Sequence, residues 1–362
     1  MDRHLTGQHV ISCERLAAFS ADVLQALGAD AKDAAQTGHH LADANACGHD
    51  SHGVIRLTEY ARDIATGDID PAAKPRIIAL RGGTALLDAR RGLGIAAAAA
   101  ALDYAMTIGR VNGVAAVALR HATHVGRLGY YAEAACREGL ILIMTAGAIG
   151  PGVGVTVLPG TAARFAGGNP WCFGFPAGPA EPPIVVDMSS SAVAEGKLRL
   201  ARAQGQQVDD GLIVDQAGRP TTDPEDFYRG GGLLPLGGPV VHKGIGLLTA
   251  SALLSALSMI GDVAPTLAGA AAPGSSVTAV GGVFMLAIDP QVFGGASTYR
   301  TLLSACLADL HASARDHGIE TAVPGEPEAA LRRLRRRDGV PLPTPVIRQL
   351  AELAVSVGVA GL

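Results

Sequence analysis

The first seventy residues place apolar side chains at the 3.6-residue period of amphipathic helices. Gly28 follows the first of these segments, Asp30 is a suitable N-cap for the second, and Gly67 with Pro71 stops the third. The pattern therefore predicts three consecutive helices, over residues 13–27, 30–46 and 52–64.

After Pro71 the pattern changes to short apolar runs cut by glycine, which is typical of strands in an α/β fold. Strands are predicted at 84–88, 114–119, 141–145, 184–188 and 283–288. Helical spacing predicts helices at about 96–108, 128–138 and 192–203. The apolar run 245–260 is short for a membrane span and contains Ser and Thr, so we expect a buried helix there.

The C-terminal part, residues 299–357, is helical in pattern again, with a break at 323–327. A chain of 362 residues holds two domains or one large domain with a cap. We therefore predict an α/β fold in two parts. Residues 1–75 and 300–362 would form a helical cap, and residues 76–299 a core that binds cofactor and substrate.

The composition narrows the class of protein. Hydrophobic residues make up 48% of the chain and charged residues 17%, so a large core is easily buried. The formal charge of −4 gives no basic footprint for nucleic acid. Five cysteines without a CxxC pair, and an N-terminus without an apolar secretion segment, favour reduced thiols and a cytoplasmic protein that binds no membrane.

One basic cluster stands out near the C-terminus. We interpret it mainly as the solvated face of a helix, with a phosphate contact as the alternative. Its members are Arg332, Arg333, Arg335, Arg336 and Arg337.

The most informative segment is 48–60, where His52, Arg56 and Tyr60 recur every four residues. Read as the start of a helix, this spacing puts all three side chains on one face. An imidazole, a guanidinium and a phenol can supply a proton, bind a carboxylate and donate a hydrogen bond. The dense polar turn between Gly48 and Gly53 favours a cleft over a merely solvated stripe.

Three glycine- or serine-rich turns are weaker candidates for cofactor contacts. The sequence GLGIAA at 92–97 imitates a dinucleotide fingerprint, but the next strand ends in Arg120 and His121 instead of the acid that binds ribose, so helix packing explains the glycines as well. The serines at 189–191, with Lys197 nearby, suit either a phosphate cradle or ordinary N-capping. Lys243 and its neighbouring glycines are compatible with a phosphate or ribose contact.

The histidines occur in two pairs, His49 with His52 and His121 with His124. The three-residue spacing is compatible with metal binding, but neither pair has the glutamate of an HExxH motif. A loop histidine at the carboxyl end of a strand is a better candidate for proton transfer or substrate contact.

Taken in order, these segments resemble the type-2 malate/L-lactate dehydrogenase family, which also contains ureidoglycolate dehydrogenase, diketogulonate reductase and the piperideine/pyrroline-2-carboxylate reductases. The likeness covers about residues 10–360. It rests on Asp50-Ser51-His52-Gly53-Val54 with Arg56 and Tyr60, Gly67–Pro71, Gly92-Leu93-Gly94, His124–Gly126 with Gly129-Tyr130-Tyr131, Gly168-Asn169-Pro170, Asp187-Met188-Ser189, His242-Lys243-Gly244 and Pro324–Glu328.

The resemblance implies an oxidoreductase that uses NAD or NADP, usually a homodimer, whose mixed-sheet cofactor core is not a Rossmann fold. It implies His52 as proton donor with Ser51 beside it, His124 in the active site, and a substrate contacted by Arg56, Tyr60, His121 and Gly168. The residues implied to line the cofactor are Asp187, Met188, Ser189, Glu195, Gly196, Lys197, His242, Lys243, Gly244, Pro324, Gly325 and Glu326.

The predicted reaction is hydride transfer to or from C2 of a small 2-oxo (2-hydroxy) acid or cyclic 2-imino acid. Two departures from the family pattern, His121 and Gly168, fall where substrate is expected, and residues 239–241 interrupt a glycine-rich run. Two rival functions stay open at this point. One is a metal-dependent hydrolase or lyase that uses the histidine pairs, and the other is a catalytically silent ligand-binding member of the same fold.

Overall fold

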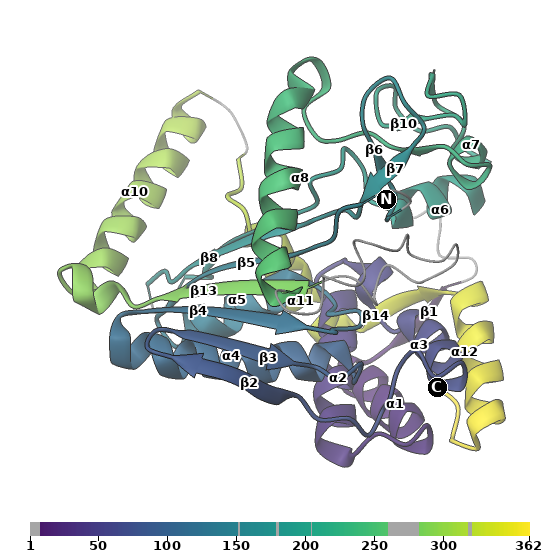
Figure 1. The fold of residues 1–362 in the computed structure, drawn as a ribbon, viewed down its shortest axis with the longest axis horizontal. Helices are drawn as coiled ribbons and strands as arrows, with labels where there is room; N and C mark the ends of the chain where they lie inside the picture. Colours follow the sequence, from purple (N-terminus) through teal and green to yellow (C-terminus); the bar gives the residue numbers. More distant parts are fainter. Residues whose placement is uncertain (1–7, 151–152, 179–180, 204, 260–281, 318–320) are drawn as a thin grey trace.

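The computed structural model describes residues 8–150, 153–178, 181–203, 205–259, 282–317 and 321–362. It is a mixed α/β fold built on a central seven-stranded sheet (Figure 1). Residues 1–7 and Ile260, which belong to segments considered above, lie outside the described residues.

The central sheet is mostly antiparallel. Its strands, in spatial order, are β2 (Arg76–Arg81), β3 (Thr84–Asp88), β4 (Val114–Arg120), β13 (Gly282–Ile288), β5 (Ile141–Gly147), β8 (Trp171–Phe175) and β9 (Ile184–Met188). Among the described strands of this sheet, only β3 and β4 run parallel, with α4 (Gly94–Asn112) between them in sequence. A doubly wound dinucleotide-binding sheet is mostly parallel, whereas the described strands of this sheet are mostly antiparallel.

Helices cover both faces of the central sheet. On β5, Leu142 and Met144 are fully buried in the core cluster formed with α4 and α5 (Leu128–Arg137). Thr145 points to the opposite face because successive strand residues alternate, and its hydroxyl contacts Ser251 of α8 (Val241–Ala256). The sheet is therefore the middle layer of the molecule (Figure 1).

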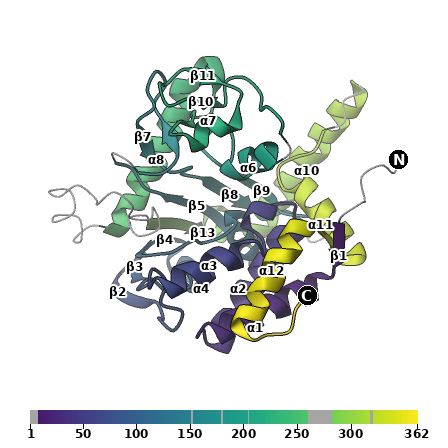
Figure 2. The same cartoon turned by 90° about the vertical axis from the view of Figure 1, so that its right-hand side faces the viewer.

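The two ends of the chain pack together in one apolar cluster. It joins α1 (Cys13–Ala26), α2 (Ala31–Ala46), α3 (Arg56–Ala65) and α12 (Thr344–Val357). Beside it, β1 (Gln8–Ile11) pairs antiparallel with β14 (Val340–Pro343). We call these four helices the helical layer; α1, α3 and α12 lie side by side in Figure 2.

A smaller lobe lies above the central sheet in Figure 1. It contains the second sheet, in the order β11 (Pro220–Thr221), β10 (Ile213–Val214), β12 (Gly232–Leu233), β6 (Thr156–Val157) and β7 (Arg164–Ala166). It also contains α6 (Glu195–Ala203) and α7 (Pro224–Tyr228). Its own apolar cluster includes Leu198, Ile213 and Phe227. We call this part the small lobe.

The remaining helical elements are α10 (Ala296–Asp316), α11 (Glu326–Asp338) and the 3₁₀ turns Asp50–His52, Gly238–Val240, Leu257–Met259 and Pro290–Phe293. Helix α10 extends away from the body on the left of Figure 1, and none of its described side chains is fully buried. All five cysteines carry free thiols.

The five predicted strands are confirmed within two residues at each end, and the helices before residue 50 within one. Two helix starts are wrong. The third helix begins at Arg56, after a 3₁₀ turn at 50–52, and α6 begins at Glu195 instead of Ala192. Before α3, the side chains of Asp50 and His52 bond to other side chains, those of Asn45 and His124. Before α6, the serine side chains bond to nearby backbone, which competes with helix formation. The short strands of the small lobe have no clear alternating pattern and were not predicted.

Two further expectations need correction. Helix α8 is buried on one face only: Leu248 is fully buried, whereas Leu253 is 62% exposed. The stretch Gly238–Met259 is apolar and long enough to cross a membrane by length and composition alone, and 28% of its apolar 18-residue window is buried. In the basic cluster, Arg332 and Arg335 are only 16% and 15% exposed and bind carboxylates, so they are not part of a solvated face.

Candidate active site

Three side chains predicted from the sequence meet in one hydrogen-bonded row. Nδ1 of His52 lies 3.0 Å from Nε2 of His124, and the other ring nitrogen of His124 lies 2.7 Å from the hydroxyl of Tyr60. The two imidazole rings are nearly parallel, with centroids 5.2 Å apart. The 3₁₀ turn, the loop after β4 and α3 supply one residue each, so the row joins the helical layer to the central sheet.

A buried amide holds the His52 turn in place. Asn45, near the end of α2, accepts a hydrogen bond from the backbone N–H of Val54 at 2.8 Å and donates one to Asp50 at 2.7 Å. A side chain at Gly53 would lie 2.2 Å from the Asn45 amide oxygen, so only glycine fits there. Asn45 was not singled out from the sequence because one asparagine late in a helix gives no motif.

The His124 loop is fixed by the glycines that imitate a dinucleotide fingerprint. Thr123 donates its hydroxyl to the carbonyl of Gly92 and accepts from the N–H of Gly94, both at 2.9 Å. A Cβ on Gly94 would lie 2.6 Å from the carbonyl oxygen of His124. The glycines therefore permit close packing of the α4 start on the His124 loop, as the packing interpretation predicts.

A third histidine lies behind this loop. His40 of α2 accepts a hydrogen bond from the N–H of Arg127 at 2.9 Å, and its ring packs against those of Tyr130 and Tyr131. Gly126 leaves the room that this ring needs, since a Cβ there would lie 2.2 Å from its Nε2. The sequence around His40 does not indicate this contact, because His40 is one of several polar residues at helical spacing in α2.

Burial sets the protonation of the row. Burial first, then the charges of Arg56 and His49, lowers the pKa of His52 to about 3. Burial, with Arg56 next, also holds the pKa of His124 well below its usual value, and burial raises the pKa of the Tyr60 phenol. Without an anion nearby, both imidazoles are therefore neutral and the phenol is protonated at neutral pH.

Arg56 is anchored at two of its five N–H groups. Its Nε donates to the carbonyl of Ser51 at 2.6 Å, and its Nη1 donates to Glu59 at 2.5 Å. Three N–H groups on Nη1 and Nη2 have no protein partner within the described part of the chain. The guanidinium is therefore held beside the His52 turn with donors left for a carboxylate.

The start of α6 packs directly on this turn. A Cβ on Gly196 would lie 2.6 Å from that of Ser51, so the predicted glycine is needed for the contact. Glu195 accepts from Arg199 and from the hydroxyl of Tyr228, each at 3.1 Å. The small lobe thus contacts the 3₁₀ turn between α2 and α3 at Ser51.

A cavity of about 230 Å³ is lined by β9 and by the turn before α11. Asp187, Pro324 and Gly325, all predicted cofactor residues, line it together with His49 and Arg127. The Nε of Arg127 is buried and has no hydrogen-bond partner among the described residues. Burial raises the pKa of Asp187. Carboxylates and an unsatisfied N–H fit the hydroxyl and amide groups of a dinucleotide better than its pyrophosphate.

Glu326 points to other partners. Its carboxylate accepts from the N–H of Val323 at 2.9 Å and lies 3.0 Å from Nε2 of His311. The Glu326 carboxylate therefore joins the turn before α11 to α10.

The serine run is bonded within the protein. Ser190 and Ser191 are buried and donate to the carbonyls of Asn169 and Val193 at 2.7 and 2.8 Å, so a cradle of three free hydroxyls is wrong for these two. Ser189 contacts the carbonyl of Gly168 at 3.0 Å and follows Met188, which pairs with β8. The run fixes the 168–170 turn against β9.

The other predicted residues lie apart from the His52 row. His121 contacts Asp88 at 3.0 Å in a left-handed backbone conformation. Within the described residues, the side chains of Lys197, His242 and Lys243 make no hydrogen bond or ion pair, so they are free to meet a ligand. Gly244 is needed for packing, because a Cβ there would overlap the carbonyl of Leu236.

The four histidines of the metal hypothesis do not converge. His49 faces Glu328 at 3.7 Å, His121 faces Asp88, and only His52 and His124 meet. In the part of the chain that the structure describes, no group of three or more candidate ligands is arranged to hold a metal ion.

Comparisons with known proteins agree with the fold and the motifs. The malate/L-lactate dehydrogenase family profile matches residues 11–351. L-sulfolactate dehydrogenase of Methanocaldococcus jannaschii is 31% identical over 93% of this chain and 94% of its own length.

Solved structures give the same result. Malate dehydrogenase of Pyrococcus horikoshii superposes with a TM-score of 0.83 at 26% identity, covering 100% of this chain and 99% of the other. The Δ1-piperideine-2-carboxylate reductase of Pseudomonas syringae superposes with a TM-score of 0.80 at 26% identity, covering 96% and 100%. The chain therefore belongs to the malate/L-lactate dehydrogenase family, whose members are NAD(P)-dependent dehydrogenases.

Proposed function

We propose that the protein transfers hydride between NAD(P)H and C2 of a small 2-oxo acid or a cyclic 2-imino acid. One observation carries the proposal: His52, whose Nδ1 lies 3.0 Å from Nε2 of His124, belongs to the same turn whose Ser51 carbonyl anchors Arg56 at 2.6 Å. A proton carrier and a carboxylate-binding group are thus fixed relative to each other by one short piece of backbone.

Arg56 would bind the substrate carboxylate. Its remaining N–H groups on Nη1 and Nη2 can make two parallel hydrogen bonds to a carboxylate, which fixes the orientation of the adjacent C2. Arg56 is also one cause of the low pKa of His52. A bound carboxylate offsets that positive charge, so substrate binding raises the pKa of His52 and favours its protonation.

His52 would carry the transferable proton on Nε2. When its ring is protonated, its Nδ1–H must donate to Nε2 of His124, because the reverse would place two N–H groups face to face. His124 then carries its proton on Nδ1 and donates to the Tyr60 oxygen, which can accept. Nε2 of His52 releases a proton to the oxygen or nitrogen of the reduced substrate and accepts it in the reverse direction.

The cofactor would supply the hydride and accept it in the reverse direction. The residues proposed to hold it are those around the β9 cavity, with the α6 and α8 starts: Asp187, Met188, Ser189, Glu195, Gly196, Lys197, His242, Lys243, Gly244, Pro324, Gly325 and Glu326. The orphaned Nε of Arg127 supports a ligand in that cavity. We propose His121 and Gly168 as outer substrate contacts on family grounds alone.

The named relatives support the substrate class. One acts on L-sulfolactate, one on malate and one on Δ1-piperideine-2-carboxylate, and each of these carries a carboxylate next to the reacting carbon. We therefore propose a substrate with that arrangement.

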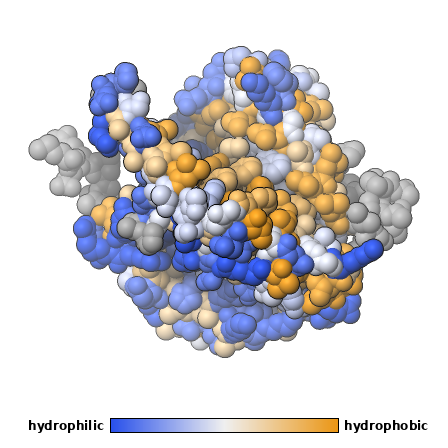
Figure 3. Space-filling model, turned by 90° about the vertical axis from the view of Figure 1, so that its left-hand side faces the viewer, coloured by the Kyte–Doolittle hydropathy of each residue, from blue (hydrophilic) through white to orange (hydrophobic). Residues whose placement is uncertain are grey.

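We further propose a cytoplasmic homodimer with a non-Rossmann core over residues 76–299 and a cap from 1–75 and 300–362. Helices α8 and α10 leave apolar side chains exposed, which a second copy would cover. These side chains are Leu253 of α8, Leu257 of the 3₁₀ turn that follows it, and Leu302 and Leu310 of α10. Figure 3 looks onto the α10 side of the molecule, where apolar residues gather over a broad area.

The test is a panel of 2-oxo and cyclic 2-imino acids with NADH and with NADPH, followed by nicotinamide absorbance. The proposal expects consumption of reduced cofactor with at least one acid. Constant absorbance across the whole panel with both cofactors would contradict it.

A further inference from the structure

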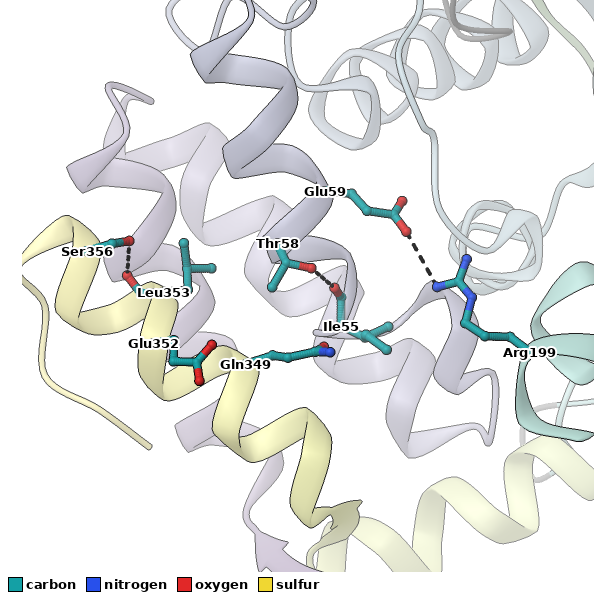
Figure 4. Close-up of a pocket in the computed structure, with 8 residues that line it drawn as sticks. All are labelled: Ile55, Thr58, Glu59, Arg199, Gln349, Glu352, Leu353 and Ser356. Atoms are coloured by element: carbon teal, nitrogen blue, oxygen red, sulfur yellow. Dashed lines mark hydrogen bonds and ion pairs between the residues drawn. The ribbon is translucent and has the colours of Figure 1, made fainter. Parts of the chain in front are cut away.

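Glu59 lies one helical turn after Arg56 on α3, and its two carboxylate oxygens face different arginines. One oxygen accepts from Nη1 of Arg56 at 2.5 Å, and the other lies 3.7 Å from Nη1 of Arg199. Arg199 belongs to α6 in the small lobe. Glu59 therefore joins the helix that carries Arg56 to the lobe that packs over the His52 turn (Figure 4).

This bridge borders an open groove of about 570 Å³ between α3, α6 and α12. Figure 4 shows Glu59 and Arg199 reaching toward each other across one end of it, with Glu352 on the α12 wall. The Arg56 and Glu59 side chains are 19% and 29% exposed, whereas Arg199 is 48% exposed. The Arg56 contact is therefore the stronger of the two, because solvent screens the outer one more.

Arg199 is itself held within the small lobe. It donates to Glu195 at 3.1 Å, and Glu195 accepts from the hydroxyl of Tyr228 at the same distance. The outer oxygen of Glu59 thus faces a guanidinium of fixed position. This arrangement keeps the inner oxygen on Arg56.

Ser51 and Glu59 bind different N–H groups of the Arg56 guanidinium. Ser51 takes the Nε hydrogen and Glu59 takes one Nη1 hydrogen, so the guanidinium plane is fixed at both edges. The remaining Nη1 and Nη2 hydrogens include the pair that can bind a carboxylate in two parallel bonds. Without Glu59 the plane is free to rotate about the Ser51 contact.

We propose that Glu59 is a positioning residue for Arg56, and that Arg199 of the small lobe orients Glu59. This inference rests on the proposed function, because it assumes that Arg56 binds the substrate carboxylate. Contact between the small lobe and the helical layer thereby sets the geometry of substrate binding.

The experiment compares wild type with Glu59→Ala, Glu59→Gln, Arg199→Ala and the double variant Glu59→Ala/Arg199→Ala. The control is Glu352→Ala, on the other wall of the same groove. The wild-type substrate panel comes first and tests the proposed function alone. KM and kcat for the acid that wild type reduces, and the Kd of reduced cofactor by fluorescence, then test the inference.

We expect Glu59→Ala to lower kcat/KM about tenfold, mainly through KM for the acid, with an unchanged cofactor Kd. Glu59→Gln keeps an acceptor and restores kcat/KM to within about threefold of wild type. Arg199→Ala has a smaller effect that vanishes in the Glu59→Ala background, because it acts through Glu59. Glu352→Ala matches wild type.

Two results overturn the inference in an active enzyme. One is a kcat/KM of Glu59→Ala within twofold of wild type. The other is additive losses from the Glu59 and Arg199 changes. A second measurement does not depend on turnover: nitrogen-15 NMR follows the rate at which the Arg56 Nε–H exchanges with solvent. We expect Glu59→Ala to accelerate this exchange and Glu352→Ala to leave it unchanged. Equal exchange in all variants also refutes the positioning role.

Discussion

Acid should destabilise this protein through three histidines whose pKa is lowered by burial. Burial lowers the pKa of His40 and of His52 to about 3 and that of His124 well below its usual value. In the unfolded chain each imidazole titrates near pH 6.5. Between these values the unfolded state binds more protons than the folded state, so stability falls as the pH drops below about 6.5.

The magnitude follows from the populations. At about pH 5.5 an unfolded-state imidazole is roughly 90% protonated while its folded counterpart stays neutral, which costs about 1.4 kcal/mol per histidine relative to about pH 7.5. The three together reduce the free energy of unfolding by about 4 kcal/mol. Asp187 works in the opposite direction, because its raised pKa makes the folded state bind a proton as the pH falls.

The assay is urea unfolding of the ligand-free protein at both pH values, with His40→Gln as the comparison. Glutamine can still accept from the Arg127 N–H, and any lost packing costs the same at both pH values. We expect the variant to narrow the difference between the two pH values by about 1.4 kcal/mol. An unchanged difference would refute the conclusion that His40 is buried in its neutral form.

Three further substitutions test separate parts of the account. Arg56→Lys should raise KM for the acid and lower kcat, because an ammonium cannot reproduce the planar fork; unchanged steady-state kinetics would remove Arg56 from the site. Tyr60→Phe deprives His124 of its partner and should lower kcat about tenfold, as measured by stopped-flow reduction. Arg332→Met leaves two buried carboxylates with one fewer cation and should cost about 3 kcal/mol in urea unfolding; a value near zero would contradict the buried network.

The sequence predicts those parts of the site that depend on local spacing. His52, Arg56 and Tyr60 recur every four residues, and although a 3₁₀ turn replaces the first helical turn, His52 and Tyr60 still reach the same partner. The sequence also makes His124 a candidate, because it lies in a loop at the carboxyl end of a strand, where such loops often contact ligands. Its partner could not be deduced, since the contact spans 72 positions.

The contacts that hold the site residues in place cannot be predicted from local sequence either, because they also join distant parts of the chain. Asn45 and His40 lie on α2 among residues of helical spacing, and their roles depend on how that helix meets two distant loops. Arg332 looked solvated because charge runs usually are, but it meets Asp43 at 2.9 Å and Glu133 at 2.5 Å across three elements. The short strands of the small lobe form only through pairing with distant segments.

His52 is the residue on which the proposed chemistry depends most. The direct test measures two quantities for His52→Ala. One is the single-turnover rate of reduction of the acid that wild type reduces, and the other is the Kd for reduced cofactor. The account predicts a rate at least about 100-fold below wild type with a cofactor Kd within about twofold. A rate near that of wild type, or a loss of cofactor affinity as large as the loss of rate, would contradict the assignment of His52 as the proton carrier.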